Sequence, residues 1–496
     1  MDSITSSIIA IALILAFSFA GGNLLSYLNQ GFSVKSFRFK GFISKIPIPP
    51  LLGMILGGII AGNLLHREIS LLDPAWALQI RNISIAVILL KAGLGLDVQK
   101  LKASSGGILR LSIVPQAFEA LIIALLSFLI FDLSWSFGFA MGFMIAAVSP
   151  AVLIPCLSEL IRDGYGLGSG IPSILMAANS LDNVIAIALF GVLINIGLGG
   201  SGDSLIFGSN NTAYYASIGP LIAVGGIIAG IILGIFFFLL TKLNDWVKGI
   251  IIALVSYGLV YAASYLNISG LGYLGVVISS TFAAVKWGKD STAKVARVIT
   301  LIWKVFQYAL FGLVGTTFYF PQLSGDTVGE CCAIIIIGSF VRIVTAYYSV
   351  SWSKLANKEK AFVGIAWLPK ATIQAALGGV LLAKAESDDK YDKYKEDGLI
   401  ILTGSVFSIL LTAPIGSILL TLFGPKLLQK SVNESKTNKE AFSPLQGSKA
   451  IQKIAPKPKG RRLSDDLSED LEYARYYMSS EDMVRSDIES MRRNSL

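Results

Sequence analysis

The chain contains thirteen long apolar runs, most of them close to twenty residues in length. They lie at 6–28, 46–65, 80–98, 106–131, 134–158, 170–198, 214–240, 249–265, 269–286, 297–318, 327–350, 361–383 and 397–424. A helix of about twenty apolar residues spans the hydrocarbon core of a bilayer. The runs therefore predict an all-α polytopic membrane protein with about thirteen transmembrane helices, in a transmembrane domain at 1–425.

The composition excludes several classes of protein. With 54% hydrophobic and 15% charged residues, a water-soluble fold of 496 residues could not hide its apolar surface. The single histidine, His66, lies at a segment end, and the three cysteines show no metal or redox spacing. No nucleophile–base pair and no cofactor loop is visible, so we expect no enzyme, no cofactor and no bound metal beyond a transported ion. The first run lacks a basic start and a clear cleavage motif, so we interpret it as a retained helix.

Loop charges predict the orientation. Short cytoplasmic loops carry an excess of Lys and Arg, and here the odd-numbered loops hold 16 basic residues against five in the even-numbered loops. This alternation places the N-terminus outside and the C-terminus in the cytoplasm. The net charge of +9 then reflects topology rather than nucleic-acid binding.

Two regions outside the apolar runs carry candidate modification sites. Asn210 begins an Asn-Asn-Thr glycosylation pattern in an even-numbered, outer loop. The tail at 426–496 is rich in charge and serine and has no long apolar run, which predicts a disordered cytoplasmic segment. Ser464 and Ser495 each follow an arginine pair, a pattern typical of basophilic kinase sites, and a plain solvated tail is the alternative.

Four charged residues interrupt the apolar runs far from their ends. Charges inside a membrane are costly and usually face a cavity or a partner. They are Glu119, Asp182, Arg342 and Lys370. Glu119 and Arg342 lie in the fourth and eleventh segments and are expected to form a buried structural ion pair, in which removal of one partner strands the other charge.

Prolines interrupt the fifth and twelfth segments. Pro150 and Pro155 lie in the fifth, and Pro369 precedes Lys370 in the twelfth. A proline removes one backbone donor from a helix and leaves carbonyl oxygens without a partner. At membrane depth such carbonyls are tolerated only where they are buried in protein or line a cavity. The segments are seven apart and therefore cross in opposite directions, as in transporters built from inverted repeats. We expect two crossed broken helices with Lys370 offsetting the carbonyl ends, the alternative being two unrelated kinks.

Asp182 is the intramembrane carboxylate that has no obvious partner in the sequence. Burial raises the pKa of such a carboxylate and a bound cation lowers it, so proton and cation compete for the group. Asn183, Ser149 and Thr372 are expected to supply neutral oxygens to the same ion site. A hydrogen-bonded structural aspartate is the alternative.

These residues carry a resemblance to a known family. The matching stretches are 81–84, 91–97, 148–152, 175–178, 310–315, 366–376 and 412–417, and the longest is Ala-Trp-Leu-Pro-Lys-Ala-Thr-Ile-Gln-Ala-Ala at 366–376. Over about 46–430 the chain resembles the NHA group of sodium/proton antiporters, the sodium/hydrogen exchanger 9B subfamily of the cation:proton antiporter superfamily.

The resemblance implies an architecture and an activity. It implies a homodimer in a plasma or organellar membrane, in which core helices at 106–198 and 327–424 move as an elevator. Helices at 1–98 and 214–318 would form the dimerisation scaffold in contact with lipid. The implied activity is exchange of Na+ or Li+ for protons, with the ion site beside the crossed helices.

One position departs from the family pattern. The family carries two adjacent aspartates in the sixth segment, whereas this chain has Asp182 followed by Asn183. The missing charge leaves open exchange with altered stoichiometry, proton-coupled transport of another ion such as chloride, and a transport-impaired regulatory protein.

Overall fold

The computed structural model describes residues 3–31, 48–96, 105–167, 169–199, 212–322, 324–351, 353 and 355–430. These residues form helices, with one isolated β-bridge between Tyr165 and Lys430. The elements are α1 (Ser3–Gly31), α2 (Pro50–Leu64), α3 (His66–Ile69), α4 (Pro74–Leu94), α6 (Ser105–Phe131), α7 (Trp135–Ala146), α8 (Pro150–Arg162), α9 (Ile171–Gly199), α10 (Thr212–Leu239), η1 (Leu240–Lys242), α11 (Asp245–Tyr265), α12 (Ser269–Thr316), η2 (Phe320–Gln322), α13 (Gly325–Ser349), α14 (Asn357–Ala366), α15 (Thr372–Leu377), α16 (Val380–Ser387), η3 (Asp389–Tyr394) and α17 (Lys395–Leu427).

The predicted all-helical membrane fold is confirmed, while the count of thirteen spans stays a prediction. Within the described ranges, ten helices are long and apolar enough to cross a membrane. The difference from thirteen arises at three places. The predicted segment at 46–65 forms the 15-residue helix α2, the segment at 361–383 is divided among three short helices, and the two segments at 269–286 and 297–318 are joined in α12.

The helix α12 is not one straight rod. Gly288 inside it has φ 76° and ψ 170°, a backbone conformation that glycine alone adopts readily. The hydroxyl of Thr292 donates to the carbonyl oxygen of Ala284 at 3.2 Å, although eight residues of straight helix would separate them by about 12 Å. The chain therefore bends sharply at Gly288, and the predicted loop between these two segments is a tight break between helices.

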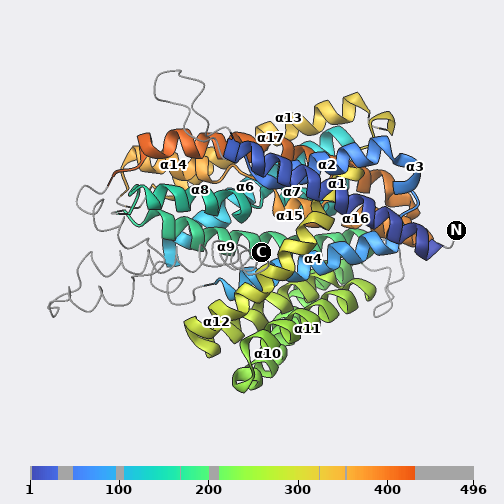
Figure 1. The fold of residues 1–496 in the computed structure, drawn as a ribbon, viewed down its shortest axis with the longest axis horizontal. Coiled ribbons are helices and arrows are strands. Elements are labelled where there is room, and N and C mark those ends of the chain that lie inside the picture. Colours follow the sequence, from blue (N-terminus) through green and yellow to red (C-terminus); the bar gives the residue numbers. More distant parts are fainter. Residues whose placement is uncertain are drawn as a thin grey trace, which may run out of the picture.

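The helices pack as two groups. The core group comprises α6–α9 and α13–α17, and the flanking group comprises α1, α2, α4, α10, α11 and α12. Figure 1 shows α10, α11 and α12 along one side and α8, α13, α14 and α17 on the opposite side. The two groups meet where α9 packs on α12 and where α15 and α16 pack on α4.

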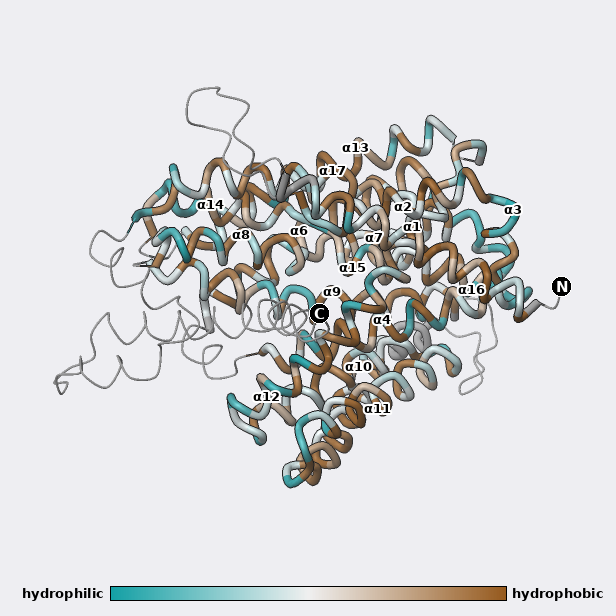
Figure 2. The backbone as a smooth tube through the Cα atoms, in the orientation of Figure 1, coloured by the Kyte–Doolittle hydropathy of each residue, from teal (hydrophilic) through white to brown (hydrophobic). Residues whose placement is uncertain are grey.

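Apolar side chains on the outer helices face away from the protein. Only 28% of the most apolar window of α10 is buried, and its exposed residues include Leu221, Ile228 and Ile235. Figure 2 shows hydrophobic segments along α10 and α11 and a hydrophilic α3. Large exposed apolar faces on long helices are explained by a lipid environment, so the chain is an integral, multi-pass membrane protein.

Candidate ion site at the crossed helix breaks

The first predicted break lies between α7 and α8. Helix α7 ends at Ala146, residues 147–149 are extended, and α8 begins at Pro150. Proline suits the first helical position because its missing N–H has no helical acceptor there. Pro155, in contrast, lies inside the continuous helix α8, so its expected place at the break is corrected to Pro150 alone.

The second break lies between α14 and α15. Helix α14 ends at Ala366 and α15 begins at Thr372, so Pro369 and Lys370 both lie in the non-helical stretch between them. The backbone N–H of Lys370 donates to the hydroxyl of Thr412 on α17 at 3.0 Å, which satisfies one group that the break leaves without a helical partner.

The two breaks contact each other directly. The backbone N–H of Ser149 donates to the carbonyl oxygen of Pro369 at 2.8 Å, and the hydroxyls of Ser149 and Thr372 lie 3.1 Å apart. Both hydroxyls are buried, since Ser149 is 1% and Thr372 5% exposed. The crossing of two broken helices is therefore confirmed, and it brings four half-helix ends with their partial charges to one place.

Gln374 closes the crossing, and its role was not predicted. Its Nε2 amide donates to the carbonyl oxygens of Met144 at 2.9 Å, Ile145 at 3.1 Å and Ala147 at 2.8 Å. The carbonyls of Ile145 and Ala147 lie at the end of α7 and just beyond it, while that of Met144 also accepts the backbone N–H of Ala147 at 3.4 Å. The signal was present in the sequence as one amide in the otherwise apolar stretch 373–383, because a buried amide in a membrane requires partners.

Four charged side chains gather beside the crossing. Glu119, Asp182, Arg342 and Lys370 are each 0% exposed. Lys370 Nζ lies 2.9 Å from Glu119 Oε1 and 3.0 Å from Oε2. The Nη2 of Arg342 donates to Asp182 Oδ1 at 2.6 Å, while its Nε lies 3.5 Å from Glu119 Oε2. The charges of these four groups sum to zero when all are ionised.

This arrangement changes the expected pairing. Arg342 does contact Glu119, but each has a shorter contact elsewhere, Arg342 with Asp182 and Glu119 with Lys370. The expectation that Asp182 has no partner is wrong. Lys370 pairs with a carboxylate rather than simply offsetting carbonyl ends. Since each member is fully buried, removal of one leaves an unmatched charge at a cost of about 3–5 kcal/mol.

The carboxylate of Asp182 connects the charge cluster to the first break. Its Oδ2 accepts the backbone N–H of Val148 at 3.1 Å, and Val148 lies in the extended stretch before α8. The backbone carbonyl oxygen of Asp182 accepts a hydrogen bond from Nε2 of Gln116 at 2.9 Å. The carboxylate thus has one oxygen on Arg342 and the other on the helix break.

Asn183 lies next to Asp182 in sequence but makes different contacts. It is 4% exposed, and its Nδ2 donates to Asn179 Oδ1 at 3.4 Å. Its Oδ1 has no hydrogen-bond partner among the described residues. Adjacent helical positions point about 100° apart, which explains why the two side chains join separate networks.

A residue of the flanking group also reaches the second broken helix. Arg81 on α4 is 2% exposed and donates from Nη1 to the carbonyl oxygen of Ala375 at 3.1 Å. A cation at a carbonyl end of α15 is electrostatically favourable. A Cβ added at Gly379 would lie 2.2 Å from Arg81 Nη2, so a larger residue there would displace this guanidinium. Sequence reasoning noted Arg81 only as part of a motif.

Asn210, Ser464 and Ser495 lie outside the described residues, as does the tail beyond residue 430.

Comparison with known proteins identifies the family. The family model "Sodium/hydrogen exchanger, transmembrane" matches residues 32–424. Sodium/hydrogen exchanger 9B2 of Mus musculus is 36% identical over 430 residues, covering 85% of this chain and 76% of the relative. The 9B2 protein of Homo sapiens is 36% identical over 412 residues, with 82% and 74% covered. The 9B1 protein of Homo sapiens is 34% identical over 397 residues, with 79% and 74% covered.

A solved structure shares the fold. The sodium proton antiporter MjNhaP1 from Methanocaldococcus jannaschii at pH 8 superposes with a TM-score of 0.66 at 18% identity, covering 86% of this chain and 99% of that one. The family model over most of the sequence and the 9B relatives at 34–36% identity show that the chain belongs to the sodium/hydrogen exchanger family, within its 9B subfamily.

Proposed function

We propose that the protein exchanges Na+ or Li+ for protons across a membrane, with Asp182 as the group that carries either ion. The observation that supports this most directly is the position of its carboxylate. It is fully buried, and one of its oxygens meets the backbone of a helix break at Val148. A carboxylate at such a crossing can hold a proton or a small cation in turn.

Neutral oxygens beside the breaks suit a small hard cation. The hydroxyls of Ser149 and Thr372 belong to the two crossed helices, and the Oδ1 of Asn183 is a buried acceptor without a donor among the described residues. Carboxylate, carbonyl and hydroxyl oxygens are the ligands that such ions prefer. We assign these three side chains to the ion site together with Asp182, with Pro150, Pro369 and Lys370 shaping the breaks.

Arg342 acts in this proposal as an internal competitor for the transported cation. It occupies Asp182 Oδ1 at 2.6 Å, and its Nε already lies 3.5 Å from Glu119. A small shift of the guanidinium toward Glu119 would free Asp182 for the cation. The cluster gains one positive charge whether Asp182 takes a proton or a monovalent cation. One-for-one exchange on this single carboxylate is therefore electroneutral.

The larger motion and assembly belong to the same proposal. The core group would carry the site across the membrane against the flanking group in an elevator-type movement, in a homodimer of a plasma or organellar membrane. The two-group packing supports this division, and the loop charges support an outer N-terminus and a cytoplasmic C-terminus.

A transport-impaired regulatory protein is the second candidate. The observation that favours it is the pairing of Asp182 with Arg342, which leaves the charge cluster neutral without a transported ion. Coupled movement of another ion such as chloride is the remaining alternative for a site that has lost one negative charge at Asn183.

Proteoliposomes that contain a pH-sensitive dye separate these functions. We expect Na+- or Li+-driven alkalinisation that Asp182→Asn abolishes. Asp73→Asn is a matched control, because Asp73 caps α4 through Ala75 N, a bond that asparagine also makes. Alkalinisation that follows chloride and ignores the cation would replace exchange with anion coupling. A folded protein without flux under any gradient would favour the regulatory role.

A further inference from the structure

A second polar site lies away from the crossed breaks, at the boundary between the two helix groups. A pocket of about 650 Å³ opens between α4 and the α11–α12 junction on one side and α16 and η3 on the other. Its walls include Asn82 and Gln79 of α4, Tyr261 of α11, and Lys384 of α16. Pockets of roughly 300–1,000 Å³ are typical of small-molecule sites.

Lys384 brings a positive charge into the pocket and makes no direct contact with a carboxylate of the described residues. Its Nζ donates to the backbone oxygen of Ser264 at 3.2 Å and to Oδ1 of Asn267, both neutral acceptors. In the described part of the chain it forms no salt bridge. Asp388 also lines the pocket and its charge acts on Lys384 from beyond salt-bridge distance, while its Oδ1 accepts the backbone N–H of Lys390 at 3.1 Å. An ammonium has three donors, so one remains for a ligand.

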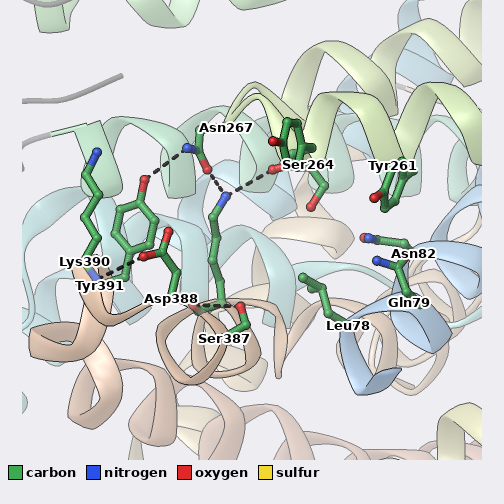
Figure 3. Close-up of a pocket in the computed structure, with 12 residues that line it drawn as sticks. Leu78, Gln79, Asn82, Tyr261, Ser264, Asn267, Ser387, Asp388, Lys390 and Tyr391 are labelled. Atoms are coloured by element: carbon green, nitrogen blue, oxygen red, sulfur yellow. Dashed lines mark hydrogen bonds between the residues drawn. The ribbon is translucent and has the colours of Figure 1, made fainter. Parts of the chain in front are cut away.

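Asn82 supplies an independent sign of a ligand on the opposite wall. Its side chain is 1% exposed, and neither Nδ2 nor Oδ1 has a hydrogen-bond partner among the described residues. Figure 3 shows the amide of Asn82 turned into the pocket beside Gln79 and the ring of Tyr261. Gln79, unlike Asn82, accepts the hydroxyl of Tyr257 at 2.9 Å. A buried amide without partners costs about 1–3 kcal/mol, which a bound polar group would recover.

We propose that this pocket binds a small organic monocarboxylate. Its carboxylate would contact the ammonium of Lys384, and a hydroxyl at its other end would bond to the amide of Asn82. The charge of the lining favours a ligand with one negative charge, because Lys384, Lys390 and Asp388 together give the pocket a net charge of +1. Tyr261, Tyr265 and Leu78 provide apolar surface for the body of the ligand.

The position of the pocket gives binding a consequence. Asn82 belongs to the flanking group and Lys384 to the core group, so a bound carboxylate joins the two. If the proposed exchange requires these groups to move past each other, the ligand will slow it. This consequence rests on the proposed function, whereas binding itself does not.

Calorimetry on the purified full-length chain in detergent tests the site with 4-hydroxybenzoate as the probe. We expect saturable binding that weakens at least about tenfold in Lys384→Gln, by loss of a charged hydrogen bond, and severalfold in Asn82→Leu. The neutral analogue 4-hydroxybenzamide should bind more weakly than the acid. Lys384→Arg should retain binding, and it covers the case in which Lys384→Gln fails to fold. Lys393→Gln alters a nearby lysine outside the lining and should change nothing.

Several results would overturn the proposal. They are no saturable binding at millimolar probe, equal affinity for the acid and the amide, or binding that neither Lys384→Gln nor Asn82→Leu affects. Chloride that competes fully with the probe at equal concentration would also overturn it, since the site would then recognise any small anion. A protein that binds the probe as expected but shows no exchange would refute the proposed function and leave this site established.

Discussion

Neutralising Glu119 alone will leave the buried cluster with an unmatched positive charge. The Nζ of Lys370 lies within 3.0 Å of both Glu119 oxygens, and both side chains are 0% exposed. Two unit charges at this distance attract by about 5 kcal/mol at an effective dielectric constant near 20. Because burial removes hydration from both groups, the net cost of deleting one partner is about 3–5 kcal/mol.

A double-mutant cycle isolates this interaction. Glu119→Gln and Lys370→Met should each lower the free energy of unfolding by about 3–5 kcal/mol, whereas the double variant keeps the neutral Arg342–Asp182 pair. We expect the double variant to lose less than the sum of the singles, by about 1–3 kcal/mol. Titration with SDS in mixed micelles, followed by circular dichroism, measures these free energies.

The control cycle uses an exposed pair of the same chain. On α8, Nη2 of Arg162 lies 3.4 Å from Oε1 of Glu159, and the two side chains are 52% and 32% exposed. Their cycle should give a coupling of at most about 0.5 kcal/mol. Additive effects at Glu119 and Lys370, equal to those of the exposed pair, would refute the cluster as a coupled unit. Single variants that fail to fold beside a double variant that folds would support the same conclusion as a measured coupling.

Two further predictions concern the neighbouring groups. Asn183→Asp adds the second carboxylate that the family pattern has at this position. Exchange by this variant in proteoliposomes should become sensitive to an imposed membrane potential, whereas exchange by the original protein should not. Potential-independent exchange in the folded variant would contradict the single-carboxylate account. Gln374→Leu removes the side-chain donor to the carbonyls of Met144, Ile145 and Ala147, of which Met144 alone keeps a backbone donor, and should destabilise the protein by about 2–5 kcal/mol in the same SDS titration. The control Thr403→Val removes only a local hydrogen bond to the carbonyl oxygen of Leu399 and should lower the free energy of unfolding by about 1 kcal/mol or less. An equal loss of unfolding free energy in the two variants would count against a special role for Gln374.

The sequence was sufficient for the membrane fold and for the two crossed breaks at Pro150 and Pro369. Apolar length identifies a membrane helix because the bilayer has a fixed thickness. Proline at Pro150 and Pro369 marks interruption because it cannot donate a backbone hydrogen bond. These are local properties of the chain. The meeting of the two breaks followed from their opposite direction, a simple consequence of their odd offset of seven segments.

Pairing inside the site could not be obtained in the same way. Two acids and two bases admit alternative partnerships, and the choice between them depends on distances of about an ångström in three dimensions. Segment correspondence favoured Glu119 with Arg342, yet the structure gives Arg342 its short contact with Asp182 and Glu119 its short contacts with Lys370. The segments at 269–286 and 297–318 predicted a loop, but not that the turn is confined to Gly288, because nothing in the sequence distinguishes a glycine with positive φ from one within a helix.

The corrected pairing alters what Asn183 means for transport. If Asp182 had no partner, asparagine at position 183 would remove one of the two negative charges that bind the ion. With Arg342 on Asp182, a second carboxylate would have made the cluster net negative, whereas asparagine keeps the ionised cluster neutral. A neutral resting cluster lowers the cost of burying these four charges in a membrane. The Asp-Asn sequence and the Arg342 contact are therefore mutually consistent, and Asn183→Asp should weaken the hold of Arg342 on Asp182 as well as add a charge.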